Sequence, residues 1–277
     1  MTARPRHILV TGGSRGIGLA IAQLFAKNTY RCTLVSRSEQ DLKVAVFSLQ
    51  PLSTQLSTSS SQDVSHQYIA GSISQGPRFW SSDSSSPFGA VLPKPSRQNS
   101  STHSSRIDVV VNCAGITQTK LFSTLDESAM ENIINTNLTA LMQGTKFLLR
   151  NGYLRGSSSS KQEKEDFSPT IINVASLLGL HGGYGAVAYA ASKAGVLGFT
   201  RALATEYASH KVRINAIVPG YVETDMTKDL HSTELEQRIP LGRFGTPAEI
   251  AHAALFLAEN QYAHNCVVNL DGGLSAV

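Results

Sequence analysis

The chain has 277 residues, of which 41% are hydrophobic and 16% charged, and its formal net charge is +4. These values are typical of a soluble globular protein with room for one large α/β domain or two small ones. They exclude the strongly basic composition of a nucleic-acid-binding protein, and no apolar run is long enough to span a membrane. We therefore expect no nucleic-acid partner and no membrane span.

Three cysteines, Cys32, Cys113 and Cys266, lie in apolar or strand-like sequence. An odd number of cysteines in such surroundings is typical of buried free thiols in a reducing compartment. The first strand-like run begins at His7, and the few residues before it are too short for an ordinary signal or transit peptide. We expect a soluble intracellular protein of the mitochondrial matrix or cytoplasm, not a secreted one.

Short apolar runs alternate with helix-period segments along most of the chain. We predict strands at residues 7–12, 31–36, 107–112, 170–176, 213–220 and 266–270, with one more possible at 66–74. We predict helices at residues 17–27, 39–50, 125–150, 187–209 and 247–258. This alternation predicts one α/β domain of the Rossmann type, with a doubly wound parallel sheet and helices on both faces.

A serine-rich segment, Leu52 to Ser105, interrupts this alternation. About a third of its residues are serine and few are large and apolar, so its composition predicts little core. We interpret residues 75–105 as a disordered insert in the single domain 1–277, and residues 155–168 as a smaller polar insert.

The stretch TGGSRGIG, residues 11–18, joins the first predicted strand to the first predicted helix. Glycines at 12, 16 and 18 would let the backbone turn tightly and approach a pyrophosphate, while the helix N-terminus supplies N–H donors. An ordinary glycine-rich turn is the alternative. The strand before it and the amphipathic helix after it favour a nucleotide site.

Arg37 lies just past the second predicted strand, where NAD sites usually carry an acid that binds the ribose 2′-hydroxyl. An arginine pairs instead with a 2′-phosphate, and Arg15 in the glycine turn is a second cation for the same group. We therefore predict NADP(H) over NAD(H). A solvated surface arginine is the alternative.

Tyr189 and Lys193 are four residues apart, so they share one face of the predicted helix 187–209. A nearby ammonium lowers the pKa of a phenol, which suits the pair to acid–base work on an alcohol or a carbonyl. For an isolated pair, a half-buried tyrosine and a surface lysine would be the favoured interpretation. Ser176 at the end of a strand and Asn137 inside an apolar helical stretch favour catalysis instead, because such an Asn is costly unless it bonds something specific.

Taken in order, TGGSRGIG, NCAG at 112–115, Asn137, Ser176 and the Tyr189–Lys193 pair resemble the short-chain dehydrogenase/reductase family. The C-terminal part, from NAIVPGYVETDMT to VNLDGG, is most similar to the family members that reduce 3-oxoacyl thioesters on acyl carrier protein in type II fatty-acid synthesis. The resemblance implies hydride transfer from NADPH, proton donation by Tyr189, and a carbonyl held by Ser176. It also implies that Lys193 lowers the tyrosine pKa and holds the nicotinamide ribose, and that Asn137 holds a water in a proton relay.

The resemblance further implies cofactor contacts along the glycine turn, the ends of the strands and the segment after residue 218. The candidate cofactor-binding residues are Gly12, Ser14, Arg15, Gly16, Ile17, Gly18, Arg37, Asn112, Ala114, Gly115, Tyr189, Lys193, Pro219, Gly220, Val222 and Thr224, and no metal is expected. Ser72 and Ile73 stand where the family usually has an acid and an apolar residue against adenine, and Cys113 stands where it usually has a second Asn.

Two partners follow from the resemblance as expectations. One is an acidic acyl carrier protein, which basic residues such as Arg150, Arg155 and Lys211 would meet near the cleft. The other is a second copy of the chain, since homotetramers built on the helices at 125–150 and 187–209 are usual in the family. The segment NQYAHNC at 260–266 lacks the family's glycine, which bears on one subunit contact.

The sequence is also compatible with two other functions. A reductase of the same mechanism could act on a small-molecule ketone or quinone. A non-catalytic NADP-binding protein is the third reading, because the adenine contacts depart from the family pattern.

Overall fold

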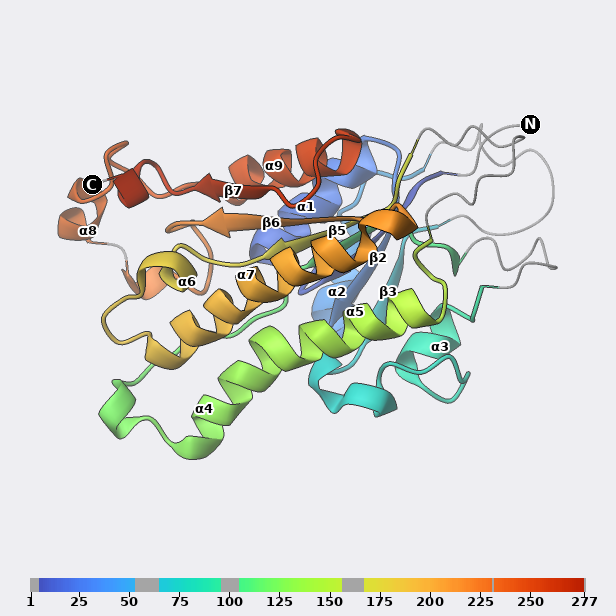
Figure 1. The fold of residues 1–277 in the computed structure, drawn as a ribbon, viewed down its shortest axis with the longest axis horizontal. Coiled ribbons are helices and arrows are strands. Elements are labelled where there is room, and N and C mark those ends of the chain that lie inside the picture. The colour runs from blue at the N-terminus through green and yellow to red at the C-terminus, as the bar shows by residue number, and fades with distance from the viewer. Residues whose placement is uncertain (1–4, 53–64, 96–104, 156–166, 231, 277) are drawn as a thin grey trace.

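Seven strands form one parallel sheet in the computed structural model, which describes residues 5–52, 65–95, 105–155, 167–230 and 232–276 (Figure 1). Their order across the sheet is β3-β2-β1-β4-β5-β6-β7, so the chain reverses its direction of winding between β1 and β4. The α/β doubly wound class is therefore confirmed. Most of the predicted polar insert at 155–168 lies outside the described residues, as do residues 96–104 of the serine-rich segment.

The strands coincide with the predicted apolar runs, and the possible strand at 66–74 is present as β3. Their bounds are β1 His7–Thr11, β2 Arg31–Ser36, β3 Gln67–Ala70, β4 Val109–Asn112, β5 Thr170–Val174, β6 Arg213–Pro219 and β7 Val267–Leu270. The five strands from β1 to β6 other than β3 are almost entirely buried, as strands covered on both faces must be.

Helices cover both faces of the sheet (Figure 1). One layer holds α1 Gly16–Lys27, α2 Glu39–Phe47 and α9 Pro247–Glu259, and the other holds α5 Ala140–Arg150 and α7 Val187–Tyr207. Successive strand residues alternate between the two cores: Ile8 and Val10 pack toward α1, while Leu9 packs toward α5. Short helices α6 Leu178–His181 and α8 Thr233–Gln237 lie in the loops after β5 and β6.

The predicted helix 125–150 is interrupted by a π-helical turn at Asn135–Thr139, between α4 Glu127–Ile134 and α5. Single π turns inside helices are rare, and many of those that occur lie at functional sites. This one contains Asn137, whose side chain is fully buried.

The prediction of a disordered insert with little core is wrong for residues 75–95. Phe79, Trp80 and Phe88 are buried and form one cluster with Phe147 and Tyr153, in which neighbouring ring centroids are 4.9–6.0 Å apart. A short helix, α3 Pro87–Val91, carries Phe88 and starts at Ser86, whose hydroxyl accepts the N–H of Gly89. The reason is that a few large rings gathered in one place bury as much apolar area as a longer run of smaller residues.

Trp80 lies against Gly144 on α5, where an added Cβ would come within 2.6 Å of the indole ring. The glycine thus provides the space in which the aromatic cluster meets the helix.

A ladder of polar side chains crosses the centre of the sheet. The amide of Asn112 donates to Thr145 at 3.2 Å and to Asn173 at 2.9 Å, and the amide of Asn173 donates to Thr200 at 2.9 Å. The ladder joins α5, β4, β5 and α7, and all four side chains are buried. Buried polar groups of this kind are stable only when each has a partner, as here.

Candidate active site

A cleft of about 800 Å³ opens at the carboxyl ends of β1, β2, β3 and β4 and reaches the loop after β6. This edge, at the point where the winding reverses, is where ligands bind in open parallel sheets. The residues that line it are Gly12, Ser14–Gly18, Val35–Arg37, Gly71–Ser74, Cys113–Thr117, Asn132, Thr136, Thr224–Met226 and Lys228.

The glycine turn fits a bound dinucleotide. Gly12 has a φ of +70°, and an added Cβ would lie 2.8 Å from the Cα of Ala114. A Cβ on Gly18 would overlap the carbonyl oxygen of Gly12. The turn therefore packs backbone on backbone and leaves the N–H groups at the start of α1 facing the cleft, as a pyrophosphate site requires.

Thr11 holds the two walls of this site together. Its hydroxyl oxygen accepts hydrogen bonds from the N–H groups of Cys113 at 3.2 Å and Ala114 at 3.3 Å. The segment after β4 is thus fixed to the end of β1.

Two cations, Arg15 and Arg37, lie along the cleft with Ser72 and Ile73. Arg15 pairs with Asp225 across the cleft at 3.2 Å, and both side chains are exposed. Asp225 is the only carboxylate among the described residues of the lining, so the acid that the family places against adenine has no counterpart there.

The four predicted catalytic side chains come together beside the cleft. Ser176 follows β5, and its hydroxyl hydrogen-bonds with Tyr189 from the first turn of α7. Lys193 lies one turn further along, with its Nζ 5.8 Å from the centre of the tyrosine ring. Lys193 is 5% exposed and donates to the carbonyl of Val174 at 2.9 Å.

Asn137 is held by the backbone opposite it. Its Oδ1 accepts the N–H of Ile116 at 2.8 Å, and its Nδ2 donates to the carbonyl of Ile116 and to Ser192, both at 3.0 Å. The hydroxyl of Ser192 in turn donates to the carbonyl of Tyr189. Both amide protons of Asn137 are therefore used, and a Cβ on Gly115 would lie 3.2 Å from Oδ1 and 3.5 Å from the Nζ of Lys193.

Burial dominates the electrostatics of this group. It lowers the pKa of Lys193 to about 8, because a charged ammonium is poorly solvated there. It also raises the pKa of Tyr189 above its ordinary value, although the hydrogen bond with Ser176 acts to lower it. The net shift of the Tyr189 pKa is thus upward, opposite in direction to the lowering expected from a nearby ammonium, because burial outweighs the other influences.

The predicted cofactor residues fall into two groups. Those of the glycine turn, together with Arg37, Ala114, Gly115 and Thr224, line the cleft. The others lie outside its lining: Asn112 in the polar ladder, Tyr189 and Lys193 beside the cleft, and Pro219, Gly220 and Val222 where β6 ends.

Several residues of the site were not predicted. Thr11 and Ser192 fix backbone through their hydroxyl groups, and Gln118 bonds the start of α7. The sequence holds no local signal for the roles of Thr11 and Gln118, because their partners are distant along the chain, whereas Ser192 bonds the carbonyl of Tyr189 one helical turn before it. Asp225 sits directly after Thr224, so its place beside the cleft could have been inferred from its neighbour.

Arg150, Arg155 and Lys211 do not lie near the cleft, contrary to the prediction. Arg150 ends α5, the carbonyl of Arg155 accepts from Arg106 just before β4, and Lys211 precedes β6. All three are at the amino ends of the strands, because α5 and α7 run antiparallel to the sheet and carry their C-termini to the edge opposite the cleft.

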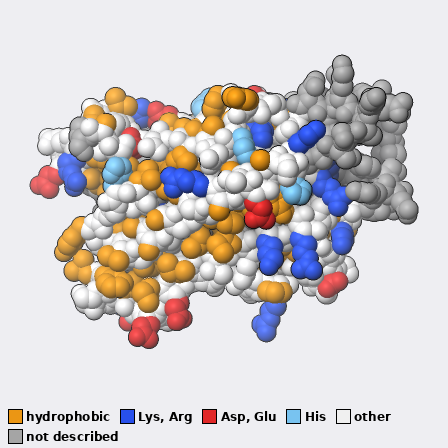
Figure 2. Space-filling model, viewed as in Figure 1, with side chains coloured by type: hydrophobic (Ala, Val, Ile, Leu, Met, Phe, Trp, Pro, Cys, Tyr) orange, Lys and Arg blue, Asp and Glu red, His pale blue; other side chains and the backbone are white. Residues whose placement is uncertain are grey.

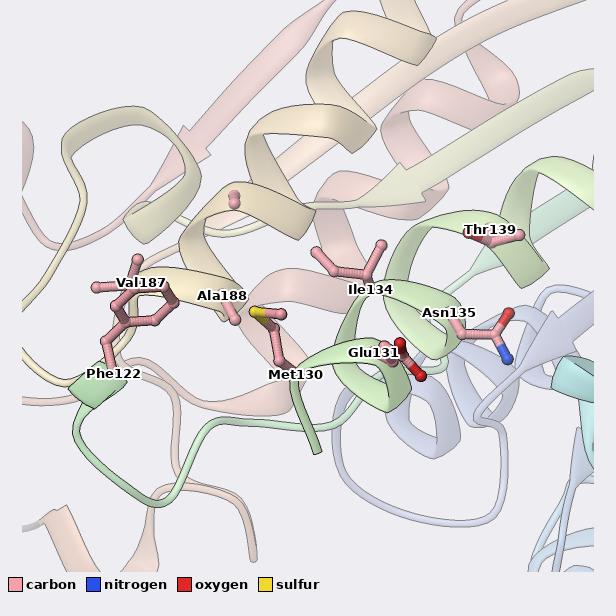
Figure 3. Close-up of a pocket in the computed structure, with 9 residues that line it drawn as sticks. Phe122, Met130, Glu131, Ile134, Asn135, Thr139, Val187 and Ala188 are labelled. Carbon is pink, nitrogen blue, oxygen red and sulfur yellow. The ribbon is translucent and has the colours of Figure 1, made fainter. Parts of the chain in front are cut away.

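A second hollow, of about 440 Å³, lies between α4 and the start of α7 (Figure 3). Phe122, Met130, Ile134, Val187 and Ala188 supply most of its surface, which is almost wholly apolar. Figure 2 shows hydrophobic side chains gathered over the same part of the molecule. Among the described helices, none has the combined length and apolarity that crossing a membrane requires.

A doubly wound sheet with a glycine-lined dinucleotide cleft, next to a buried Ser–Tyr–Lys group, defines a nicotinamide-dependent oxidoreductase of the Rossmann class. The chain belongs to the short-chain dehydrogenase family, whose model matches residues 6–68 and 97–235. The gap between the two matched ranges contains the aromatic cluster residues Phe79, Trp80 and Phe88, so this is where the chain departs from the family.

Individual relatives agree with this assignment. A 3-oxoacyl-[acyl-carrier-protein] reductase of Homo sapiens is 34% identical over 270 residues, covering 97% of each chain. Carbonyl reductase family member 4 of Xenopus laevis is 33% identical and covers 96% of each chain. A crystal structure of a short-chain dehydrogenase/reductase of the glucose/ribitol dehydrogenase type from Brucella melitensis has a TM-score of 0.78 and 26% identity, covering 97% of this chain and 96% of its own. The protein is thus an NAD(P)-dependent oxidoreductase that acts on a ketone.

Proposed function

We propose that the protein reduces a 3-oxoacyl thioester, carried on acyl carrier protein, to the 3-hydroxyacyl thioester with NADPH. The observation that supports this most is the convergence of Ser176, Tyr189 and Lys193 beside a cleft that carries Arg15 and Arg37. The full-length similarity to the human 3-oxoacyl-[acyl-carrier-protein] reductase supports the choice of substrate.

The side chains divide the chemistry between them. Ser176 donates a hydrogen bond to the 3-oxo oxygen and holds the carbonyl in place. Tyr189 donates its phenolic proton to the same oxygen as negative charge develops there. Its raised pKa keeps the phenol protonated at neutral pH, as a proton donor must be. A bound NADPH supplies the hydride to the carbonyl carbon.

Lys193 keeps positive charge near the phenol and replaces its proton, because a pKa of about 8 lets it both hold and release one near neutral pH. The same ammonium would also hold the ribose next to the nicotinamide of a bound cofactor. Asn137 holds a relay water through its backbone carbonyl or the second lone pair of Oδ1, since both of its amide protons are taken by Ile116 and Ser192.

NADPH is the proposed cofactor because Arg37 and Arg15 line the cleft past the end of β2 and in the glycine turn. Arg37 is the main reader of the 2′-phosphate, since Arg15 is already paired with Asp225. Arg37→Asp is therefore expected to shift the ratio of kcat/KM for NADPH and NADH toward NADH by ten-fold or more. An unchanged ratio would show that Arg37 does not contact the phosphate.

The test of the function is NADPH oxidation with acetoacetyl groups on carrier protein, on CoA and on unrelated ketones. The proposal expects the carrier-bound substrate to be reduced fastest, and equal rates on all three would remove the carrier-specific claim. Tyr189→Phe should abolish turnover with NADPH binding intact, whereas Tyr262→Phe, at a 97% exposed tyrosine, should change nothing. Retained activity in Tyr189→Phe would exclude it as the acid.

A small-molecule ketone or quinone is the second candidate substrate, supported by the 33% identity to carbonyl reductase family member 4. The same panel decides between the two, because this alternative expects free ketones or quinones to be the best substrates. In either case the enzyme works in the cytoplasm or mitochondrial matrix.

We also propose a homo-oligomer, a tetramer by family resemblance, assembled through α4, α5 and α7. The apolar hollow between α4 and α7 supports it, as do the exposed side chains of Phe122 before α4, Met142 on α5 and Val187 on α7. Light scattering after size exclusion tests the assembly, and Val187→Asp should reduce the measured mass to that of a smaller species.

A further inference from the structure

Gln118 is a buried side chain that has no role in the proposed reaction. It lies in the segment that follows β4, is 9% exposed, and makes hydrogen bonds at both ends of its amide. Its Oε1 accepts the N–H of Ala188 at 2.9 Å, and its Nε2 donates to the carbonyl of Lys120 at 2.8 Å. Exchanging the two amide atoms would set N–H against N–H and oxygen against oxygen, so this orientation is the one that satisfies both partners.

The bond to Ala188 lies at the start of α7. The first N–H groups of any helix lack partners within it. Ala186, the residue before this helix, has only a methyl group and offers no side-chain acceptor. Gln118 provides the missing acceptor from another part of the chain. Ala188 directly precedes Tyr189, so the bond fixes the backbone one residue before the phenol.

The segment that carries Gln118 also forms a wall of the cofactor cleft. Cys113–Thr117 line the cleft, and Ile116 is held through both backbone groups by Asn137. Gln118 thus links a wall that contacts the cofactor to the helix that carries the proton donor. The link is rigid, because the amide is bonded at both ends and buried.

We infer that Gln118 is a positioning residue that sets Tyr189 at the distance and angle needed for proton transfer. This inference rests on the proposed role of Tyr189 as the proton donor. It does not depend on which ketone is the substrate. Gln118 acts through the backbone of α7, and it touches neither the substrate nor the reacting atoms.

The test is Gln118→Leu, which keeps the size of the side chain and removes the acceptor. A displacement of the donor by about an ångström slows chemistry steeply, so kcat is expected to fall about ten- to a hundred-fold while the KM for NADPH changes less than about two-fold. The primary isotope effect with 4-deuterated NADPH should increase, because the hydride step becomes more fully rate-limiting. Gln118→Glu keeps an acceptor for Ala188 at the positive end of the helix but sets an oxygen against the carbonyl of Lys120, so it should recover part of the lost kcat.

Thr246→Ala is the matched control. It removes a side-chain acceptor from the first turn of α9, outside the lining of the cleft, where Thr246 accepts the N–H of Glu249. It should lower the melting temperature without changing kcat. If Gln118→Leu behaves in the same way, with reduced stability but unchanged kcat and isotope effect, Gln118 is only a helix cap and the inference is overturned.

The substrate for these measurements is whichever carbonyl compound the unaltered enzyme reduces fastest. A failure of the 3-oxoacyl proposal therefore appears as a different best substrate for the unaltered enzyme. A failure of the Gln118 inference appears as equal kcat in Gln118→Leu and the unaltered enzyme on that same substrate.

Discussion

The buried ammonium of Lys193 predicts a specific pH dependence of the reaction. Lys193 is 5% exposed, and burial lowers its pKa from 10.5 to about 8. This difference in pKa corresponds to about 3 kcal/mol by which the site disfavours the charged form. The protonated lysine that the mechanism requires is therefore lost at only moderately alkaline pH.

The expected profile follows from the two groups that must be protonated. The kcat/KM for NADPH reports the protein before the cofactor binds. It should be level below about pH 8 and fall tenfold per pH unit above it. Tyr189 does not contribute to this limb, because its pKa lies above the ordinary value of 10.0 and the phenol stays protonated.

Lys193→Arg tests whether deprotonation of Lys193 causes the decline in kcat/KM. A guanidinium keeps its charge throughout the range, so the decline near pH 8 should disappear even if the absolute rate is lower. Lys146→Arg, at an exposed position on α5, should leave the profile unchanged. A decline that persists near pH 8 in Lys193→Arg, or a flat profile from pH 7 to 9 in the unaltered enzyme, would show that Lys193 does not cause the decline.

Four further variants test the fold. Gly12→Ala sets a Cβ 2.8 Å from the backbone after β4 at a φ of +70°, so it should weaken NADPH binding by more than tenfold in fluorescence titration, with little loss of secondary structure by circular dichroism. Gly144→Ala drives a Cβ to 2.6 Å from Trp80, whereas Gly198→Ala on α7 meets nothing within 4 Å. Both gain helix propensity, so urea unfolding should find the first less stable than the second by the overpacking cost, about 1–3 kcal/mol, and equal stabilities would contradict the packing. His66 accepts a backbone N–H of β2 on one ring nitrogen, and burial lowers its pKa below 6.5, so its contribution to stability is full above that pH and is lost as the pH falls toward the lowered pKa. The melting temperature of His66→Gln should accordingly drop less between pH 7 and 5 than that of the unaltered protein, and an identical drop would exclude this histidine as the cause.

The strands, the main helices and the glycine turn could be predicted because their signals are local. Each buried strand is a short apolar run, and the glycine turn is defined by the order of strand, glycines and helix. The pairing of Tyr189 with Lys193 follows from helix geometry alone. These features need only neighbours along the chain.

The aromatic cluster could not be predicted, because its signal is three-dimensional. Phe79, Trp80 and Phe88 are sparse among serines, and only their packing on α5 over Gly144 makes them a core. The hydrogen-bond partners of Asn137 could not be predicted either. Its presence in an apolar helix indicated a specific bond, but no neighbouring residue in the sequence identified the backbone of Ile116 as the partner.

The direction of the pKa shift of Tyr189 could not be predicted from the sequence either. Sequence spacing indicates that an ammonium is near, but burial depends on every element packed around the pair. In this structure the effect of burial on the phenol is the larger one.

The polar ladder at the centre of the sheet has a consequence for the alignment of strands. Asn112 and Asn173 are direct partners in the pairing of β4 with β5. A slip of one residue would set each amide against an apolar neighbour and leave buried donors without acceptors, which costs about 1–3 kcal/mol for each group. The same slip would move Ser176 by about 3.3 Å relative to Cys113 and the cofactor cleft. The hydrogen bond between the two amides therefore excludes the misaligned pairing of β4 with β5. It also fixes the distance between the cofactor cleft and Ser176.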